Sequence, residues 1–111
     1  MSERALSVSV EKVGGRSVFR LAGDLVDSAQ EDLDAAYDSA DGAGTIVLDF
    51  EEVGFIDSTG IAVLLRLLRR AMSDGRGVSA VGLNDHYREV FDLTHVSEFM
   101  TVEPRPGPGR E

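Results

Sequence analysis

The sequence contains no cysteine and no tryptophan, and its only lysine is Lys12. The absence of cysteine excludes disulfides and thiolate metal sites. The first six residues lack the basic flank and the apolar core of a secretion signal. No apolar run approaches the roughly 20 residues that span a bilayer. We therefore expect a cytoplasmic protein without a membrane segment.

Positive charge is scarce as well. Eleven Lys and Arg residues stand against 20 Asp and Glu residues, which gives a net charge of -9. Proteins that bind nucleic acid need clustered Lys and Arg to contact phosphates, so we expect no direct nucleic-acid partner. An acidic surface keeps a protein soluble and suits a basic protein partner.

The length of 111 residues fits one domain with one core. Hydrophobic residues make up 42% and charged residues 28%, as in ordinary globular proteins, and the low aromatic content of 6% predicts an aliphatic core. All three prolines lie in residues 104–111, which cannot form ordinary helix or sheet. We expect a single domain over residues 1–103 and a disordered tail over residues 104–111.

The start of the chain predicts a β-hairpin. Apolar and polar residues alternate from Leu6 to Glu11, as in a strand with one face in solvent. A turn at Gly14-Gly15 leads to a second strand over Ser17–Ala22, which we expect to end at Gly23.

A first helix should follow. Ser28 and Glu31 have the spacing of a capping box, in which each side chain satisfies a free backbone donor of the first turn. Gly42 is well placed to stop the helix. One helical face carries Ala29, Leu33, Ala36, Tyr37 and Ala40.

The central stretch predicts a buried strand, a short acidic loop and a long helix. Ile46–Leu48 is apolar throughout, as expected of a strand buried on both faces, and it ends in Asp49. The helix runs from about Ser58 to about Asp74, with Gly75 as its stop. Its expected core stripe is Ile61, Leu64, Leu65, Leu68 and Met72. Val63 and Leu67 fall off this stripe and are available for flank packing or for a docking surface.

The last part predicts a strand over Val78–Leu83, a short helix capped by Asn84 or Asp85, and a final strand over Met100–Val102. The expected inner face of that helix is Tyr87, Val90 and Phe91, with Thr94 as a further candidate. The order is β-β-α-β-α-β-α-β. Alternating strands and helices imply right-handed crossovers and parallel strands, whereas the hairpin is antiparallel. The fold class is therefore α/β with a mixed sheet.

Metal, nucleotide and receiver sites find little support. The only histidines, His86 and His95, do not have the number or spacing of a zinc site. The glycines of residues 41–45 precede a strand and lack the Gly-Lys-Ser/Thr of a phosphate loop. Asp49 ends a strand, as in phosphoacceptor receivers, but the acidic pair and the late lysine of receivers are missing. We expect neither a cofactor nor a metal.

The segment Asp57-Ser58-Thr59-Gly60 is the strongest candidate site. It does not match the Asp-Thr/Ser-Gly of aspartic proteases or the G-x-S-x-G of a nucleophile elbow, and no base is assigned to activate the serine. We therefore expect no enzyme. Two interpretations stay open from the residues alone. Asp57 or Ser58 caps a helix, as such residues commonly do, or Ser58 is a modified hydroxyl on a docking surface.

Three motifs bear on this choice. They are Leu21-Ala22-Gly23-Asp24-Leu25, then Val47-Leu48-Asp49-Phe50 with Phe55-Ile56-Asp57-Ser58-Thr59-Gly60-Ile61, and finally Phe91-Asp92-Leu93-Thr94 with Phe99. With them, residues 6–102 resemble the STAS domain, and specifically the bacterial anti-sigma factor antagonists. His95 departs from the glycine common at its position, but His tolerates positive φ better than most residues, so the turn should survive.

The resemblance implies a function by partner switching. Ser58 aligns with the serine that an anti-sigma factor phosphorylates, and Asp24, Asp57, Thr59 and Gly60 match its surroundings. We add Val63 to these partner-binding residues. The partner would be a serine kinase of the histidine-kinase-like ATPase fold, which releases a sigma factor when it binds this chain. A separate serine phosphatase would restore Ser58. The alternative is an interaction subunit of another assembly, such as a lipid-transport or stress-sensing complex.

Overall fold

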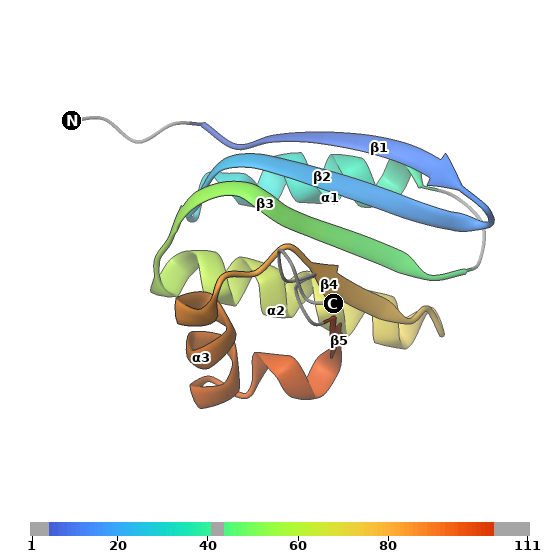
Figure 1. Ribbon diagram of the computed structural model, residues 1–111. Helices are drawn as coiled ribbons and strands as arrows, with labels where there is room; N and C mark the ends of the chain where they lie inside the picture. Colours follow the sequence, from blue (N-terminus) through green and yellow to red (C-terminus); the bar gives the residue numbers. More distant parts are fainter. Residues whose placement is uncertain (1–4, 41–43, 104–111) are drawn as a thin grey trace, which may run out of the picture.

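A single mixed sheet organises the chain, and its strands lie side by side in the order in which they occur in the sequence (Figure 1). The computed structural model describes residues 5–40 and 44–103. The first two strands are antiparallel and all later neighbours are parallel, which confirms the predicted mixed sheet. The strands are β1 (Ser7–Val13), β2 (Arg16–Leu25), β3 (Ile46–Ile56), β4 (Val78–Val81) and β5 (Thr101–Val102).

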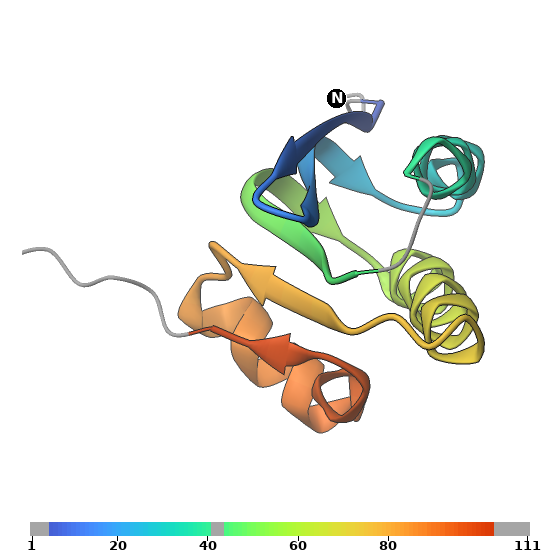
Figure 2. The ribbon, with the colours of Figure 1, turned by 90° about the vertical axis from the view of Figure 1, so that its right-hand side faces the viewer.

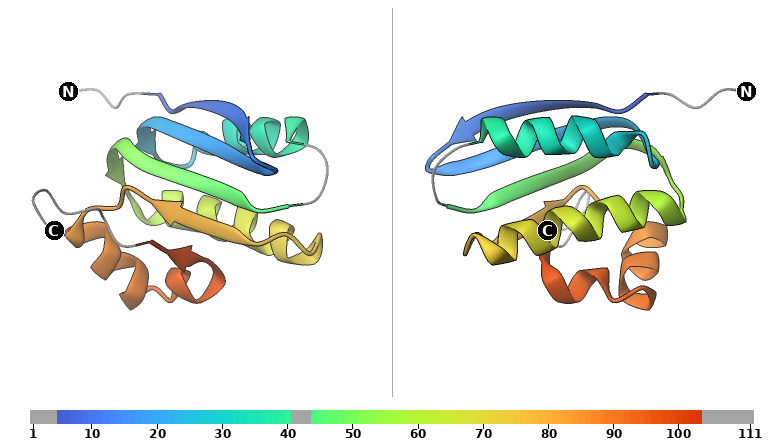
Figure 3. Two further views of the ribbon diagram at one scale, coloured as in Figure 1. Left: turned by 45° about the vertical axis from the view of Figure 1, so that its right-hand side comes forward. Right: turned by 180° about the vertical axis from the view of Figure 1, so that it is seen from behind.

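Helices cover one face of the sheet. The two longer helices lie side by side on that face, and the shorter ones lie near β4 and β5 (Figures 2 and 3). The helices are α1 (Ala29–Ser39), α2 (Ser58–Ser73), α3 (Asp85–Leu93) and a short 3-10 helix, η1 (Val96–Phe99). The predicted element order is confirmed, with η1 as an addition that the sequence analysis did not anticipate.

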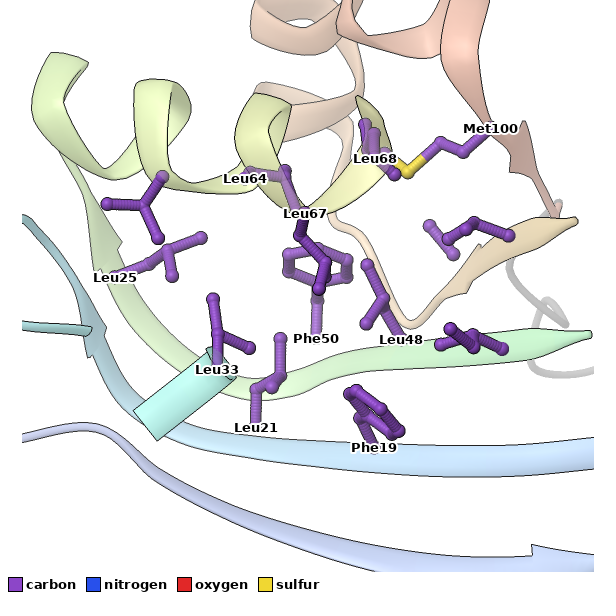
Figure 4. Packing of buried hydrophobic residues seen from close by; sticks show 14 of the residues in the cluster. Phe19, Leu21, Leu25, Leu33, Leu48, Phe50, Leu64, Leu67, Leu68 and Met100 are labelled. Atoms are coloured by element: carbon purple, nitrogen blue, oxygen red, sulfur yellow. The ribbon is translucent and has the colours of Figure 1, made fainter. Parts of the chain in front are cut away.

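The core lies between the sheet and these helices and is mostly aliphatic, as expected. Ile46, Val47 and Leu48 of β3 are all buried, as predicted for a central strand. Ile46 and Leu48 belong to the core cluster, whereas Val47, on the opposite face, does not. Phe50 and Phe91 meet edge to face with ring centroids 5.6 Å apart and join α3 to β3. Figure 4 shows the packing of Phe19, Leu21, Leu25, Leu33, Leu48, Phe50, Leu64, Leu67, Leu68 and Met100.

The predicted buried face of α2 is partly wrong. Val63 and Leu67 expose only 5% and 3% of their surface, whereas Met72 exposes 55%. The helix is rolled so that Gly60, Leu64, Leu67 and Ala71, at spacings of three and four residues, face the sheet and α1. Val63 therefore lies in the core, and its side chain is not part of an exposed docking surface.

β2 and β3 are both longer than predicted. β2 does not end at Gly23: it continues to Leu25, with Gly23 at φ 117° and a register shift beside it. The expected acidic loop after Phe50 is also strand, because residues 52–56 pair with the extended end of β2. The two strands thus support each other beyond the end of β4, which pairs with β3 only as far as Asp49.

The helix boundaries agree better with the predictions. α2 begins at Ser58, and Gly75 follows its end with φ 73°. Asn84 caps α3 by accepting a hydrogen bond from the Tyr87 backbone N–H at 2.8 Å. His95 has φ 66°, which confirms that histidine keeps the left-handed turn.

Two further predictions for α1 and the tail have different outcomes. The capping box of α1 is not formed, because the Ser28 side chain makes no cap hydrogen bond. The predicted stop at Gly42 and the tail over residues 104–111 lie outside the described residues.

Candidate functional site

The candidate site lies where the ends of β2 and β3 meet the first turn of α2. The Asp57 backbone N–H donates to the Leu25 carbonyl at 3.4 Å, which holds the start of the helix against the last residue of β2. A Cβ atom on Gly60 would lie 1.8 Å from that same Leu25 oxygen. Only glycine permits this approach, so the backbone of β2 fixes the position of the helix N-terminus.

Asp57 is the N-cap of α2. Its backbone is extended, and its Oδ1 accepts a hydrogen bond from the Gly60 N–H at 2.8 Å. The Thr59 hydroxyl donates to the same oxygen at 2.7 Å. The hydrogen bond from Thr59, followed by that from Gly60, lowers the pKa of Asp57 below its ordinary value. The cap is therefore a carboxylate at neutral pH, and it places negative charge where the helix dipole favours it.

Ser58 is the first residue inside the helix, and its side chain is exposed. Within residues 5–40 and 44–103, its hydroxyl has no hydrogen-bond partner. The capping that the sequence allowed to either Asp57 or Ser58 is thus performed by Asp57 alone. No histidine, lysine or arginine in the described part of the chain contacts the Ser58 hydroxyl to activate it as a nucleophile. The arrangement presents Ser58 to other molecules.

Other predicted site residues gather at the same end of the sheet. Asp24 is buried, with 8% of its surface exposed, and it lies opposite Phe55 in the register of β2 and β3. The structure therefore brings Asp24, Asp57, Ser58, Thr59 and Gly60 together, whereas Val63 lies one turn further along α2 in the core. In Figure 1, β3 turns directly into α2 at this corner of the molecule.

Phe55 is a site residue that the sequence analysis did not single out as one. Half of its surface is exposed, which is unusual for a phenylalanine and places an apolar side chain beside the acidic residues of the site. The sequence offered little reason to select Phe55, because its segment was expected to be a loop and Phe55 was named only as part of the central motif.

A small cavity of about 210 Å³ lies beside β3, between Phe50, Val53, Leu83 and Tyr87. Tyr87 is part of its lining, and the Tyr87 hydroxyl accepts a hydrogen bond from the Ile56 N–H at 3.2 Å. Among the described residues, no group of three or more His, Cys, Asp or Glu is arranged to hold a metal ion. None of the helices in that part of the chain has the length and apolar character needed to cross a membrane.

Solved structures share this fold. SpoIIAA, an anti-sigma factor antagonist, matches in its unphosphorylated form with a TM-score of 0.65 and 23% identity, over 88% of each chain. An anti-sigma factor antagonist from Mycobacterium paratuberculosis matches with a TM-score of 0.67 and 22% identity, over 90% of this chain and 86% of the other. A sulfate transporter family protein from Wolinella succinogenes matches with a TM-score of 0.69 and 19% identity, over 78% and 74%.

Comparisons of the sequence identify the family. No curated protein is significantly similar to this chain in sequence. The family profile described as "Mlab, STAS domain" matches residues 8–102, which span β2, β3, α2 and the whole candidate site. The SpoIIAA structure has the same fold. The chain belongs to the STAS domain family.

Proposed function

We propose that this chain is an anti-sigma factor antagonist that works by partner switching. In its unmodified form it binds an anti-sigma factor, which then releases its sigma factor. The anti-sigma factor is a serine kinase of the histidine-kinase-like ATPase fold, and it transfers a phosphoryl group from ATP to the Ser58 hydroxyl. The modified chain dissociates, and a serine phosphatase restores the hydroxyl. The chain is the substrate of this chemistry and supplies no catalytic residue.

The observation that supports this proposal is that Asp57 caps α2 and leaves the Ser58 hydroxyl exposed. Asp57 provides the cap, so the exposed Ser58 hydroxyl is not needed to hold the helix. SpoIIAA, which shares the fold, has been solved in a phosphorylated form, with a TM-score of 0.61 to this chain. The fold likeness supports the site, and the position of Ser58 at the helix N-terminus supports its modification.

Electrostatics explains how one phosphate would change binding without unfolding the domain. A phosphoserine adds about -1.5 to -2 charges. The N-terminus of α2 favours negative charge, since free N–H groups and the helix dipole point toward it. At an interface, however, the added charge lies beside the Asp57 carboxylate and faces a partner shaped for a hydroxyl. A penalty of about 3 kcal/mol weakens binding on the order of 100-fold.

Capture experiments test the proposal. Tagged wild type, Ser58→Ala and Ser58→Asp are used as baits in lysate from the source organism, and bound proteins are identified by mass spectrometry. We expect wild type and Ser58→Ala to retain a protein of the histidine-kinase-like ATPase fold and Ser58→Asp to lose it. Incubation of the purified pair with labelled ATP should label wild type and leave Ser58→Ala unlabelled.

A matched control is Ser9→Asp, which adds the same charge at an exposed position on the outer face of β1. It should retain the kinase as wild type does. Equal recovery of the kinase by wild type and Ser58→Asp would contradict the proposal, as would labelling of Ser58→Ala.

A second candidate is an interaction subunit of another assembly. It is favoured by the description of the matching family, which names Mlab, and by the sulfate transporter family structure of similar fold. The same capture experiment separates the two candidates. A transporter ATPase or another assembly component that binds regardless of the residue at position 58 would favour this second function.

A further inference from the structure

The outer face of α2 carries a largely exposed stripe of side chains that begins at Ser58. Residues separated by alternating steps of four and three positions point the same way from a helix. On α2 these residues are Ser58, Ala62, Leu65, Arg69 and Met72, here called the outer stripe. Leu65 is half-buried and the other four are exposed. In the right-hand view of Figure 3 no other helix or strand covers α2 from this side.

The middle of the outer stripe is hollowed. A depression of about 220 Å³ is lined by Ala62, Leu65, Arg66 and Arg69. Its floor is aliphatic and its rim is formed by two guanidinium-bearing side chains. Such a hollow fits an apolar side chain of a partner better than a polar one, because the floor offers no hydrogen-bonding side chain.

The three arginines of α2 differ in their partners within the chain. Arg70 pairs with Asp38 and lies 4.0 Å from Asp34, both on α1. Arg66 donates to the neutral Gln30 side chain at 2.8 Å. Arg69 is exposed, and no acceptor or acidic group contacts it in the described part of the chain. Arg69 is therefore a positive charge available to a partner on a protein whose net charge is -9.

The charge along the outer stripe is uneven. Its N-terminal end begins beside the ionised cap Asp57 and lies near Asp24, whereas its C-terminal half carries Arg66 and Arg69. Favourable charge in the last turns of a helix explains why arginine is tolerated there. It does not explain why apolar side chains are exposed beside Arg69. An apolar hollow next to an unpaired cation is the complement of an apolar side chain next to a carboxylate.

We propose that the outer stripe is the second half of the interface with the kinase partner, and that it binds a segment of that partner with an apolar side chain in the hollow and a carboxylate on Arg69. This inference rests on the proposed function. At 1.5 Å per residue, Arg69 lies about 16 Å along the helix from Ser58. Contacts at both points fix how the partner lies on α2, so Ser58 always reaches the same place in its active site.

The first test measures affinity with purified proteins. The probe is the kinase-fold protein recovered by the Ser58→Ala variant, which is titrated with wild type, Arg69→Glu and Arg16→Glu. Arg16 is an exposed arginine at the start of β2, so Arg16→Glu makes the same charge change outside α2 and the outer stripe. We expect Arg69→Glu to weaken binding about 10-fold at low salt, and the loss to shrink in 1 M salt, where the Debye length is about 3 Å. Arg16→Glu should bind as wild type does.

The second test identifies the carboxylate. The sequence has a single lysine, Lys12, in the hairpin. Arg69→Lys therefore adds one amine on α2, and a zero-length carbodiimide joins amines to carboxylates in contact with them. We expect Arg69→Lys to be joined to an Asp or Glu of the kinase, and the matched Arg16→Lys and the native Lys12 amine to give no such product.

The two proposals fail in different ways. If Ser58→Asp loses the kinase while Arg69→Glu binds as tightly as wild type, and Arg69→Lys gives no cross-link, the outer stripe is not an interface and partner switching stands. If Arg69→Glu weakens binding and Arg69→Lys is cross-linked while Ser58→Asp binds normally, the outer stripe stands as an interface and the switch at Ser58 is wrong. All of these substitutions are at exposed positions, and thermal unfolding of each variant checks that the fold is intact.

Discussion

The two long helices of this domain begin in different ways. α1 has Ser28 as its N-cap, with helical backbone angles and no hydrogen bond from the side chain. Its entry is a continuous turn, in which the backbone N–H groups of Ala29 and Gln30 donate to the carbonyls of Val26 and Asp27. α2 has Asp57 as its N-cap, in an extended conformation, and its carboxylate receives two hydrogen bonds.

The difference shows which of the two helices has its first turn fixed in position by more contacts. The turn into α1 satisfies its first donors with backbone carbonyls, so the side chain of Ser28 is dispensable. The start of α2 is fixed by a side-chain cap, by the contact of Gly60 with β2 and by the bond from Asp57 to Leu25. The backbone at the start of α2, which carries Ser58, is therefore fixed by more contacts than the start of α1.

The largest effect should come from Gly60→Ala. Its methyl group would meet the Leu25 oxygen at 1.8 Å, so either β2 or the first turn of α2 must shift. We expect a loss of about 3 kcal/mol or more in the free energy of unfolding, measured by urea denaturation. Gly77→Ala is the control, because its methyl group would have only an ordinary contact with Thr45 at 3.9 Å. A similar small loss for both would show that the start of α2 is not tightly fixed.

Substitution of the N-cap residue should reduce stability more at α2 than at α1. Asp57→Ala deletes a side chain that accepts two hydrogen bonds and should cost about 1 kcal/mol of stability. Ser28→Ala deletes a side chain without a cap bond and should cost less than about 0.5 kcal/mol. Denaturant titration of both variants measures the difference. A larger loss for Ser28→Ala would reverse the comparison.

The pH dependence of stability should reveal the contribution of the Asp57 carboxylate. The folded pKa of Asp57 lies below its ordinary value, mainly because of the bond from Thr59. Its contribution is therefore complete above the unfolded pKa of about 3.9 and is lost as the pH falls through the folded pKa. Thermal melts of wild type and Asp57→Asn should differ most near neutral pH and converge at low pH. A constant difference would mean that the carboxylate charge plays no part in the cap.

The smallest effect on folding should come from Ser58. Because Asp57 provides the cap, Ser58→Ala should change the free energy of unfolding by less than about 0.5 kcal/mol. Ser58→Asp should also stay folded, since a negative charge in the first turn suits the helix dipole. Circular dichroism melts measure both. A large loss for either variant would mean that Ser58 shares the cap and that its binding phenotypes cannot be separated from stability.

Local patterns predicted the elements that depend on local signals. The ends of α2, the cap of α3 at Asn84 and the left-handed His95 each follow from one or two residues and their neighbours. The strand over residues 51–56 did not, because acidic residues and Gly54 have low strand propensity. These residues are held in the sheet by the end of β2, which lies far away in the sequence.

The candidate site was predicted in composition and not in detail. Asp57 and Ser58 are both good capping residues, so only the extended backbone at Asp57 decides between them. The buried face of α2 was misassigned for a similar reason. Apolar residues occur around most of the helix, and the position of α1 and the sheet determines that Val63 is buried and Met72 is exposed.

The order of strands in the sheet bears on how the domain is made. Each new strand is added beside the one synthesised before it, so no strand has to be inserted between two that are already paired. A chain that leaves the ribosome from its N-terminus can therefore extend one growing edge. The ends of β2 and β3 and the first turn of α2 all come from residues 24–61. During translation, the segment that carries Ser58 emerges with both of its supporting strands already made, before β4, α3 and β5 exist.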